Sequence, residues 1–202
     1  MASAAPIDFY FDFSSPYGYF ASHRIDGIAA KHGREVAWRP YLLGVVFQTT
    51  GQKPLVEQPL RGDYARHDFE RCARFYGIPF AFPARFPVMS LAPARAFYWL
   101  VDDDPAAAKA LAKAIYDAYF NGGADISKPE TVIALAEPLG VDGEALAAAL
   151  GDDAVKARLK AETEQAIARG AFGSPFVIVD GEPFWGADRL DQVDLWLEGG
   201  GW

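Results

Sequence analysis

The pair Ser15-Pro16 marks the place at which this sequence could perform chemistry. Serine followed by proline is typical of a helix start, because serine can cap the first turn and proline fits it. That turn leaves backbone N–H groups without helical partners, and the helix dipole adds partial positive charge. A hydroxyl there can stabilise a bound carboxylate, phosphate or thiolate. From the local residues alone, the alternative is that Ser15, or Ser14, is only an N-cap.

The cysteine and the histidines of the sequence do not indicate a reactive site or a metal site. Cys72 is the single cysteine, which excludes an internal disulfide and a cysteine-based metal cluster. We expect it to be a small buried hydrophobic residue. His23, His32 and His67 lack metal-ligand spacing, so we expect them on helix surfaces and expect no metal site.

Composition limits the class of protein. With 202 residues, of which 51% are hydrophobic, the chain fits one domain or one domain with an insertion. The net charge of −8 argues against a nucleic-acid partner and against an anionic membrane surface. No apolar stretch approaches the ~20 residues of a membrane span. The N-terminal MASAAP lacks the features of a signal peptide, so we expect a soluble, cytoplasmic protein.

The element that must position Ser15 is the run before it. Residues 7–13 are aromatic and aliphatic except for Asp8 and Asp12, which predicts a buried strand. A helical pattern follows, ending at Gly33, and residues 35–44 predict a second strand. A strand, a helix and a strand in so short a space predict a right-handed parallel crossover.

The middle of the chain reads as helical after an irregular start. Residues 48–60 contain two prolines and no clear period, which predicts a long loop, and such loops are often functional. Helical spacing recurs over residues 62–76, a passage rich in proline and phenylalanine follows over residues 77–93, and several helical segments then lead to Gly170, a glycine of the kind that ends helices. One helix is expected to open with a capping box at Ser127, and another to begin at Asp142.

The last 30 residues change character. Ser174-Pro175 precedes a β-branched strand, Gly181-Glu182 predicts a turn, and PFWG predicts a second short strand. A final helix follows, with Leu190 and Val193 among its apolar positions. Strands at both ends with helices between them indicate one α/β domain carrying a helical insertion.

This order of elements resembles the thioredoxin-fold branch that includes DsbA. A Cys-Pro-x-Cys motif starts the first helix in that branch, whereas the chain here has Ser15-Pro16-Tyr17-Gly18, which excludes disulfide chemistry. The segments FDFSSPYGYF and GSPFVIVDGEPFWGADRL resemble kappa-class glutathione transferases and the 2-hydroxychromene-2-carboxylate isomerases. The resemblance implies a thioredoxin-like fold with a large all-helical insertion. We predict residues 1–47 and 170–202 as the thioredoxin-like domain and 48–169 as the insertion.

The resemblance also implies a glutathione site. Ser15 would contact the sulfur, whose ordinary pKa of ~8.5 falls at a helix N-terminus. Pro175 matches the cis-proline of the fold, so that the backbone of Ser174 would pair with the peptide like an added strand. Ala187 and Asp188 would hold the γ-glutamyl end, the first through its backbone and the second through its carboxylate.

Two further positions are implied on the glutathione side. Gln52 stands where relatives commonly carry asparagine, and its longer side chain leaves the contact open. Trp185 could wall the pocket or lie in the core, and the core is the preferred interpretation.

The substrate side rests on four residues. Lys53 and Arg61 could bind a substrate carboxylate, with a solvated loop as an equal alternative. Arg85 and Phe86 align with the stretch that lines the second-substrate site in the isomerases. For these two, simple packing is the alternative.

The function implied is that of a glutathione-dependent cis-trans isomerase of the 2-hydroxychromene-2-carboxylate type, in aromatic-compound catabolism. The thiolate of glutathione would add reversibly to a conjugated carbon of an aromatic carboxylate, a bond would rotate, and elimination would follow. A homodimer is expected by analogy. The alternatives are a kappa-like glutathione transferase and a non-catalytic, DsbA-like peptide-binding module, although a peptide binder has no need of the ADR segment.

Overall fold

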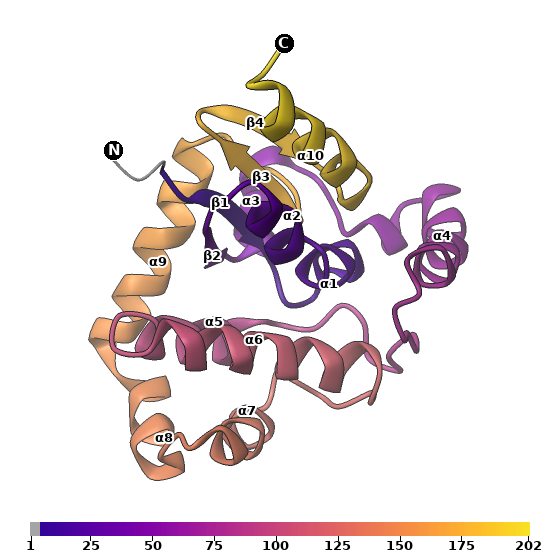
Figure 1. Cartoon of the computed structure of the whole chain (residues 1–202). Helices are drawn as coiled ribbons and strands as arrows, with labels where there is room; N and C mark the ends of the chain where they lie inside the picture. Colours follow the sequence, from indigo (N-terminus) through magenta and orange to yellow (C-terminus); the bar gives the residue numbers. More distant parts are fainter. Residues whose placement is uncertain (1–4) are drawn as a thin grey trace.

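A four-stranded sheet lies at the centre of the structure, a computed structural model that describes residues 5–202 (Figure 1). The strand order is β2-β1-β3-β4. Strands β1 (Ile7–Phe11) and β2 (Val36–Pro40) are parallel, as the crossover predicted. Strands β3 (Phe176–Val179) and β4 (Glu182–Trp185) form an antiparallel hairpin, and β3 lies antiparallel to β1. The sheet therefore joins the two ends of the chain.

Strand β1 is buried along its whole length and packs on both faces. Phe11 lies within 5.7 Å, ring to ring, of both Trp38 and Tyr116 on one face. Tyr10 faces a second, smaller core on the other side, 6.2 Å from Tyr41. Because successive side chains of a strand point to opposite faces, an aromatic run of this kind serves two cores at once. Each such buried ring contributes about 1.5–3 kcal/mol.

Helices α1 and α2 follow β1, and α10 closes the chain beside α2. Helices α5 and α6 lie side by side between the sheet and the pair α7–α8, whereas α4 and α9 lie at opposite sides of the molecule (Figure 1). The bounds of the helices are α1 Pro16–Ser22, α2 Ile25–Lys31, α3 Leu43–Thr50, α4 Arg61–Tyr76, α5 Leu91–Leu100, α6 Pro105–Phe120, α7 Pro129–Ala136, α8 Gly143–Gly151, α9 Asp153–Ala168 and α10 Leu190–Gly199. Short 3₁₀ turns occupy Leu55–Glu57 (η1), Glu137–Leu139 (η2) and Ala187–Arg189 (η3).

Several local predictions are confirmed. Asp142 caps α8 by accepting from Glu144 N at 2.9 Å, and Gly170, with φ of 82°, follows α9. The charged residue Asp8 within the buried strand is paired with Arg39 and Arg169, each at 2.6 Å. A buried carboxylate is tolerated where cations satisfy it.

Other local predictions are wrong. The loop expected over residues 48–60 begins inside α3 and contains η1. Helix α5 was not predicted. No capping box opens α7: its N-cap is Lys128, and the Ser127 hydroxyl instead donates to Asp125 at 2.5 Å. The predicted domain division between residues 47 and 48 falls within α3, and that division stays a prediction.

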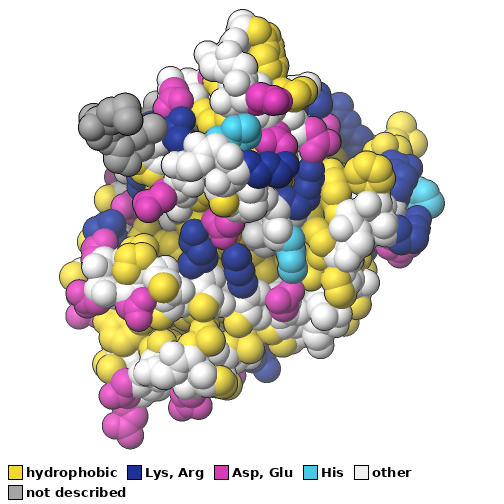
Figure 2. Space-filling model, in the orientation of Figure 1, with side chains coloured by type: hydrophobic (Ala, Val, Ile, Leu, Met, Phe, Trp, Pro, Cys, Tyr) yellow, Lys and Arg dark blue, Asp and Glu magenta, His cyan; other side chains and the backbone are white. Residues whose placement is uncertain are grey.

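The surface carries both signs of charge. Basic side chains are interspersed with acidic ones over the face drawn in Figure 2. Across residues 5–202 no helix is both long and apolar enough to cross a membrane. Residues 1–4, which belong to the N-terminal segment expected not to be a signal peptide, lie outside the described residues.

Candidate functional site

Ser15 is the N-cap of α1, as predicted, and its side chain is almost fully buried. Its backbone is extended (φ −105°), and its Oγ accepts a hydrogen bond from Gly18 N at 3.0 Å. The same hydroxyl donates to the carbonyl oxygen of Ser174 at 2.8 Å, 159 residues later in the chain. The first turn of α1 is thereby joined to the residue before Pro175.

The Ser174-Pro175 peptide bond is cis, as the resemblance implied. The Ser174 hydroxyl points inward and accepts from Asp12 N at 2.9 Å. Glycine at position 18 allows this close approach, because a Cβ there would lie 2.6 Å from the Tyr116 hydroxyl and 2.8 Å from Ser174 Oγ. The start of α1 therefore lies directly against the turn that leads into β3.

Asp12 follows strand β1 and holds several segments together, a role that its place in the apolar run of residues 7–13 does not predict. Its carboxylate accepts from Ser14 N at 2.8 Å and from Leu43 N at 2.9 Å, at the start of α3. Its carbonyl oxygen accepts from Ser15 N and from the Tyr116 hydroxyl, both at 2.9 Å. Burial raises the pKa of this carboxyl, and the backbone hydrogen bonds offset part of that rise. We call Asp12, Ser15, Ser174 and Pro175 the serine seat.

The Ala187-Asp188 segment lies beside the serine seat. Gly186 N donates to Pro175 O at 3.1 Å, which fixes the start of η3 next to the cis-proline. Arg24 donates to Ala187 O at 3.2 Å and also bonds to the carboxylate of Asp191 on α10. The Asp188 side chain is exposed, 3.2 Å from Arg189.

The segment of residues 85–88 borders the seat on another side. Val88 N donates to Ser14 Oγ at 3.0 Å. Phe86 is half-buried in an aromatic cluster with Phe69, Phe82, Tyr119 and Phe120. Packing thus accounts for Phe86, whereas its contact with a substrate stays a prediction. The Arg85 guanidinium pairs with Asp125 at 2.7 Å, and nothing in residues 5–202 links it to the seat.

Trp185 does not lie in the core, which corrects the preferred interpretation. Its side chain is 57% exposed at the edge strand β4. The indole packs against Phe172, with ring centroids 4.8 Å apart, and covers the backbone of Gly173, where a Cβ would lie 2.1 Å from Nε1. Trp185 therefore walls the surface next to Ser174 and Pro175.

The residues expected in the middle loop remain apart from the seat. Gln52, Lys53 and Arg61 are exposed, and Gln58 bonds to Lys53 O at 2.8 Å and to the Arg61 guanidinium at 3.3 Å. Within the described part of the chain, no hydrogen bond or ion pair joins these three side chains to Ser15. Their roles stay predictions.

Cys72 has an unreactive environment on α4. Tyr17, two residues after Ser15, donates to Asp68 at 2.6 Å, and the Cys72 thiol lies 3.6 Å from the same carboxylate. Burial, together with the nearby Asp68 charge, raises the pKa of Cys72 to about 11. Burial likewise raises the pKa of Tyr17. Cys72 is therefore held as a thiol, and it packs partly buried against the core.

The three histidines are separate from one another. His23 and His67 are exposed, as expected, but His32 is largely buried and bonds to Asp194 on α10 at 2.7 Å. No group of three histidine, cysteine, aspartate or glutamate side chains in residues 5–202 could hold a metal ion.

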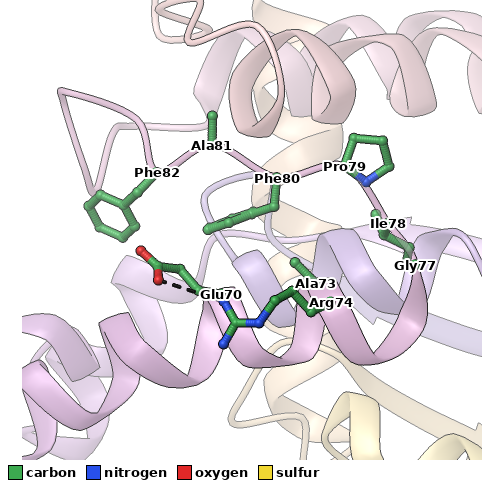
Figure 3. Close-up of a pocket in the computed structure, with 9 residues that line it drawn as sticks. All are labelled: Glu70, Ala73, Arg74, Gly77, Ile78, Pro79, Phe80, Ala81 and Phe82. Carbon is green, nitrogen blue, oxygen red and sulfur yellow. Dashed lines mark ion pairs between the residues drawn. The ribbon is translucent and has the colours of Figure 1, made fainter.

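A groove of about 620 Å³ opens elsewhere, between the C-terminal half of α4 and the segment 77–82 (Figure 3). Its lining comes from α4 and the segment 77–82, with apolar side chains such as Ile78 and Phe80. At its rim, Glu70 and Arg74 form an exposed ion pair at 3.9 Å. We call it the α4 groove. It includes none of the residues expected in the site.

Comparisons with known proteins cover nearly the whole chain. The sequence matches the family described as DSBA-like thioredoxin domain over residues 6–198. It is 31% identical to a 2-hydroxychromene-2-carboxylate isomerase of Sphingobium xenophagum, over 95% of this chain and 97% of that protein. It is 26% identical to human glutathione S-transferase kappa 1, over 93% and 88% of the two chains.

A solved structure of a 2-hydroxychromene-2-carboxylate isomerase superposes with a TM-score of 0.87 at 30% identity, covering 96% of this chain and 95% of that one. The predicted thioredoxin-like fold with a helical insertion is thereby confirmed.

Proposed function

The chain belongs to the DSBA-like thioredoxin family, in the branch of the 2-hydroxychromene-2-carboxylate isomerases and kappa-class glutathione transferases, and we propose that it is a glutathione-dependent isomerase of the 2-hydroxychromene-2-carboxylate type. The observation that carries this proposal is a hydroxyl, and no sulfur, at the start of α1 beside a cis-proline. A site of this kind binds and ionises a thiol that a ligand brings.

The residues present fit glutathione. The backbone of Ser174, next to the cis-proline, offers a peptide the edge pairing that extended ligands use. The N–H groups of Ala187 and Asp188 open η3 and so lack helical partners, which suits a carboxylate. The exposed Asp188 carboxylate suits an ammonium group. These are the complementary charges of a γ-glutamyl end.

Glutathione, when bound, supplies the nucleophilic thiol of the reaction. The part of this chain is to favour the ionised sulfur: Ser15 donates a hydrogen bond to it, and the dipole of α1 adds partial positive charge. The Tyr17 hydroxyl donates to Asp68, and burial raises the pKa of the Cys72 thiol, so we give neither group the role of proton acceptor.

For the second substrate, we assign an aromatic or conjugated carboxylate. Lys53 and Arg61 carry charge without an acidic partner among residues 5–202, so a substrate carboxylate is a reasonable partner for them. Phe86 and the exposed Trp185 supply apolar surface on two sides of the seat. Gln52 remains the proposed counterpart of the asparagine of the relatives. Arg85 is the weakest assignment, because Asp125 already pairs with it.

A kappa-like transferase is the second candidate, supported by the similarity to human glutathione S-transferase kappa 1. Both reactions need the same ionised thiol and differ in whether a stable thioether leaves the site. A peptide-binding module without catalysis is less well supported, because it would not use the Ala187-Asp188 segment.

The test is turnover of 2-hydroxychromene-2-carboxylate by the purified protein with and without reduced glutathione. We expect isomerisation that requires glutathione. Mass spectrometry should show that the glutathione is unchanged after the reaction. A stable glutathione adduct would favour the transferase. Absence of turnover and adduct over a panel of conjugated carboxylates would contradict both enzymatic assignments.

The remaining assignments rest on the sequence and on the family resemblance. A cytoplasmic location, a place in aromatic catabolism and a homodimer are part of the proposal, as is the division into residues 1–47 with 170–202 and 48–169. Light scattering on the purified chain tests the homodimer, and a monomeric mass would contradict it.

A further inference from the structure

The hydroxyl of Ser15 has a single hydrogen, and the structure shows where it goes. A carbonyl oxygen can only accept, so the 2.8 Å contact between Ser15 Oγ and Ser174 O uses that hydrogen. The oxygen of the same hydroxyl accepts from Gly18 N at 3.0 Å. Ser15 therefore has no second hydrogen to offer to a sulfur.

Both ends of this bond are held in place. Ser15 N donates to Asp12 O, and Asp12 N donates to Ser174 Oγ, both at 2.9 Å. The Tyr41 hydroxyl donates to Gly173 O at 2.7 Å, which fixes the residue before Ser174. With the heavy atoms fixed, the hydrogen of Ser15 can change acceptor by rotation about the Cβ–Oγ bond alone.

We propose that the carbonyl of Ser174 and the sulfur of the bound ligand compete for the single hydrogen of Ser15, so that Ser15 selects the ionised thiol. The inference rests on the proposed function, because the backbone of the peptide must satisfy the Ser174 carbonyl when the hydrogen leaves it. Otherwise a buried carbonyl would lose its donor, which is unfavourable.

The competition has a chemical consequence. A thiolate attracts the hydrogen more strongly than a neutral carbonyl, because hydrogen bonds to charged acceptors are the stronger ones. A thioether is a weak acceptor, and an alanine side chain accepts nothing. With those ligands the Ser15 hydroxyl keeps its hydrogen bond to the Ser174 carbonyl. Ser15 thus favours glutathione with an ionised sulfur over its thioether adducts, which favours elimination of the adduct back to the thiolate.

Two Ser-Pro pairs occur in the sequence, Ser15-Pro16 and Ser174-Pro175, and they allow a direct test. Protein labelled with carbonyl-¹³C serine and ¹⁵N proline gives only these two carbonyl–nitrogen signals in carbon-detected NMR. The signal from Ser15, whose carbonyl accepts from Tyr19 N, is an internal reference. It disappears in Ser15→Ala, which assigns the other signal to Ser174.

The spectra of wild type and Ser15→Ala are compared with two ligands. One is glutathione, at a pH above the ordinary thiol pKa, and the other is γ-glutamyl-alanyl-glycine, which has no thiol. With the alanine tripeptide, the Ser174 carbonyl shifts of the two proteins should differ, because wild type keeps the hydroxyl bond. With glutathione the two Ser174 carbonyl shifts should coincide, because the Ser15 hydroxyl of wild type then donates its hydrogen bond to the sulfur and no longer to Ser174. Ser15→Gly, which keeps most of the capping stability, serves as a second hydroxyl-free variant.

The other outcomes separate the two claims. An equal difference with both ligands would overturn the competition and leave glutathione binding intact. Coincident shifts with both ligands would overturn it as well, because the bond to Ser174 would then be absent without a thiolate. If calorimetry detects no glutathione binding to wild type, the proposed function fails and this inference fails with it.

Discussion

The serine seat and the α4 groove differ in what surrounds the space beside them. The groove has a volume of about 620 Å³, yet its lining is mostly apolar and comes from one helix and the segment after it. The seat is built from segments about 160 residues apart that hydrogen-bond through Asp12, Ser15 and Ser174. A functional site needs a few converging polar groups, and volume without them supports packing only. The predictions that follow set one region against the other.

The largest expected effect comes from Asp12→Ala. This change removes the acceptor of two part-buried N–H groups, those of Ser14 and Leu43. We expect the free energy of unfolding to fall by about 3 kcal/mol, because unsatisfied buried donors cost about 1–3 kcal/mol each. Denaturant unfolding measures it. Glu70→Ala at the groove is the control, expected within about 0.5 kcal/mol of wild type. Equal losses in the two variants would remove the distinction between the regions.

Ser15→Ala should lower kcat/KM by about ten- to a hundredfold, because it removes the donor to the developing thiolate. This expected loss is smaller than for a donor that is free from the start, because the Ser15 hydroxyl must first give up its hydrogen bond to the Ser174 carbonyl. Steady-state kinetics with glutathione measures the change, and the melting temperature checks the fold. Full turnover by the variant would contradict the role given to Ser15.

The contribution of Asp12 to the stability of the serine seat should depend on pH. Burial raises the pKa of this carboxyl in the folded state. The folded protein then binds its proton more tightly than the unfolded chain does, so this contribution to stability is complete below the ordinary pKa of ~3.9. It is lost as pH rises through the raised pKa. The stability of wild type minus that of Asp12→Asn should therefore fall with increasing pH. A difference that rises with pH would contradict the sign.

The smallest effect is expected from Arg74→Ala in the α4 groove. Its ion pair with Glu70 is exposed and 3.9 Å long, and such pairs contribute little. Glutathione affinity and kcat/KM should stay within about twofold of wild type, a difference of ~0.4 kcal/mol. A tenfold loss of either would show that the groove belongs to the site.

The same comparison shows what the sequence could and could not reveal. Ser15, the cis-proline and the Ala187-Asp188 segment were found because each lies in a contiguous motif at a helix or strand start. Asp12 was visible as a charge in an apolar run, but its partner at Leu43 lies 31 residues away.

Errors arose where a distant partner decides. The local sequence around Arg85 does not show its ion pair with Asp125, 40 residues on, and its role as a substrate ligand stays a prediction. Trp185 looked like core because large aromatic residues usually are, yet an edge strand leaves it exposed. Helix α5 begins inside the passage over residues 77–93, whose prolines interrupt the helical pattern of the sequence. Helix α5 packs against α6, and the local pattern could not reveal this tertiary contact.

The most direct test of the central claim is calorimetric titration of the protein with reduced glutathione, repeated with Asp188→Ala. Asp194→Ala is the matched control, since it removes the same charge from α10 at a residue that pairs with Lys31 and His32 and not with the seat. We expect binding by wild type and by the control, weakened about tenfold in Asp188→Ala. Absence of heat with wild type at several temperatures, or equal affinity in all three proteins, would contradict a glutathione site at the serine seat.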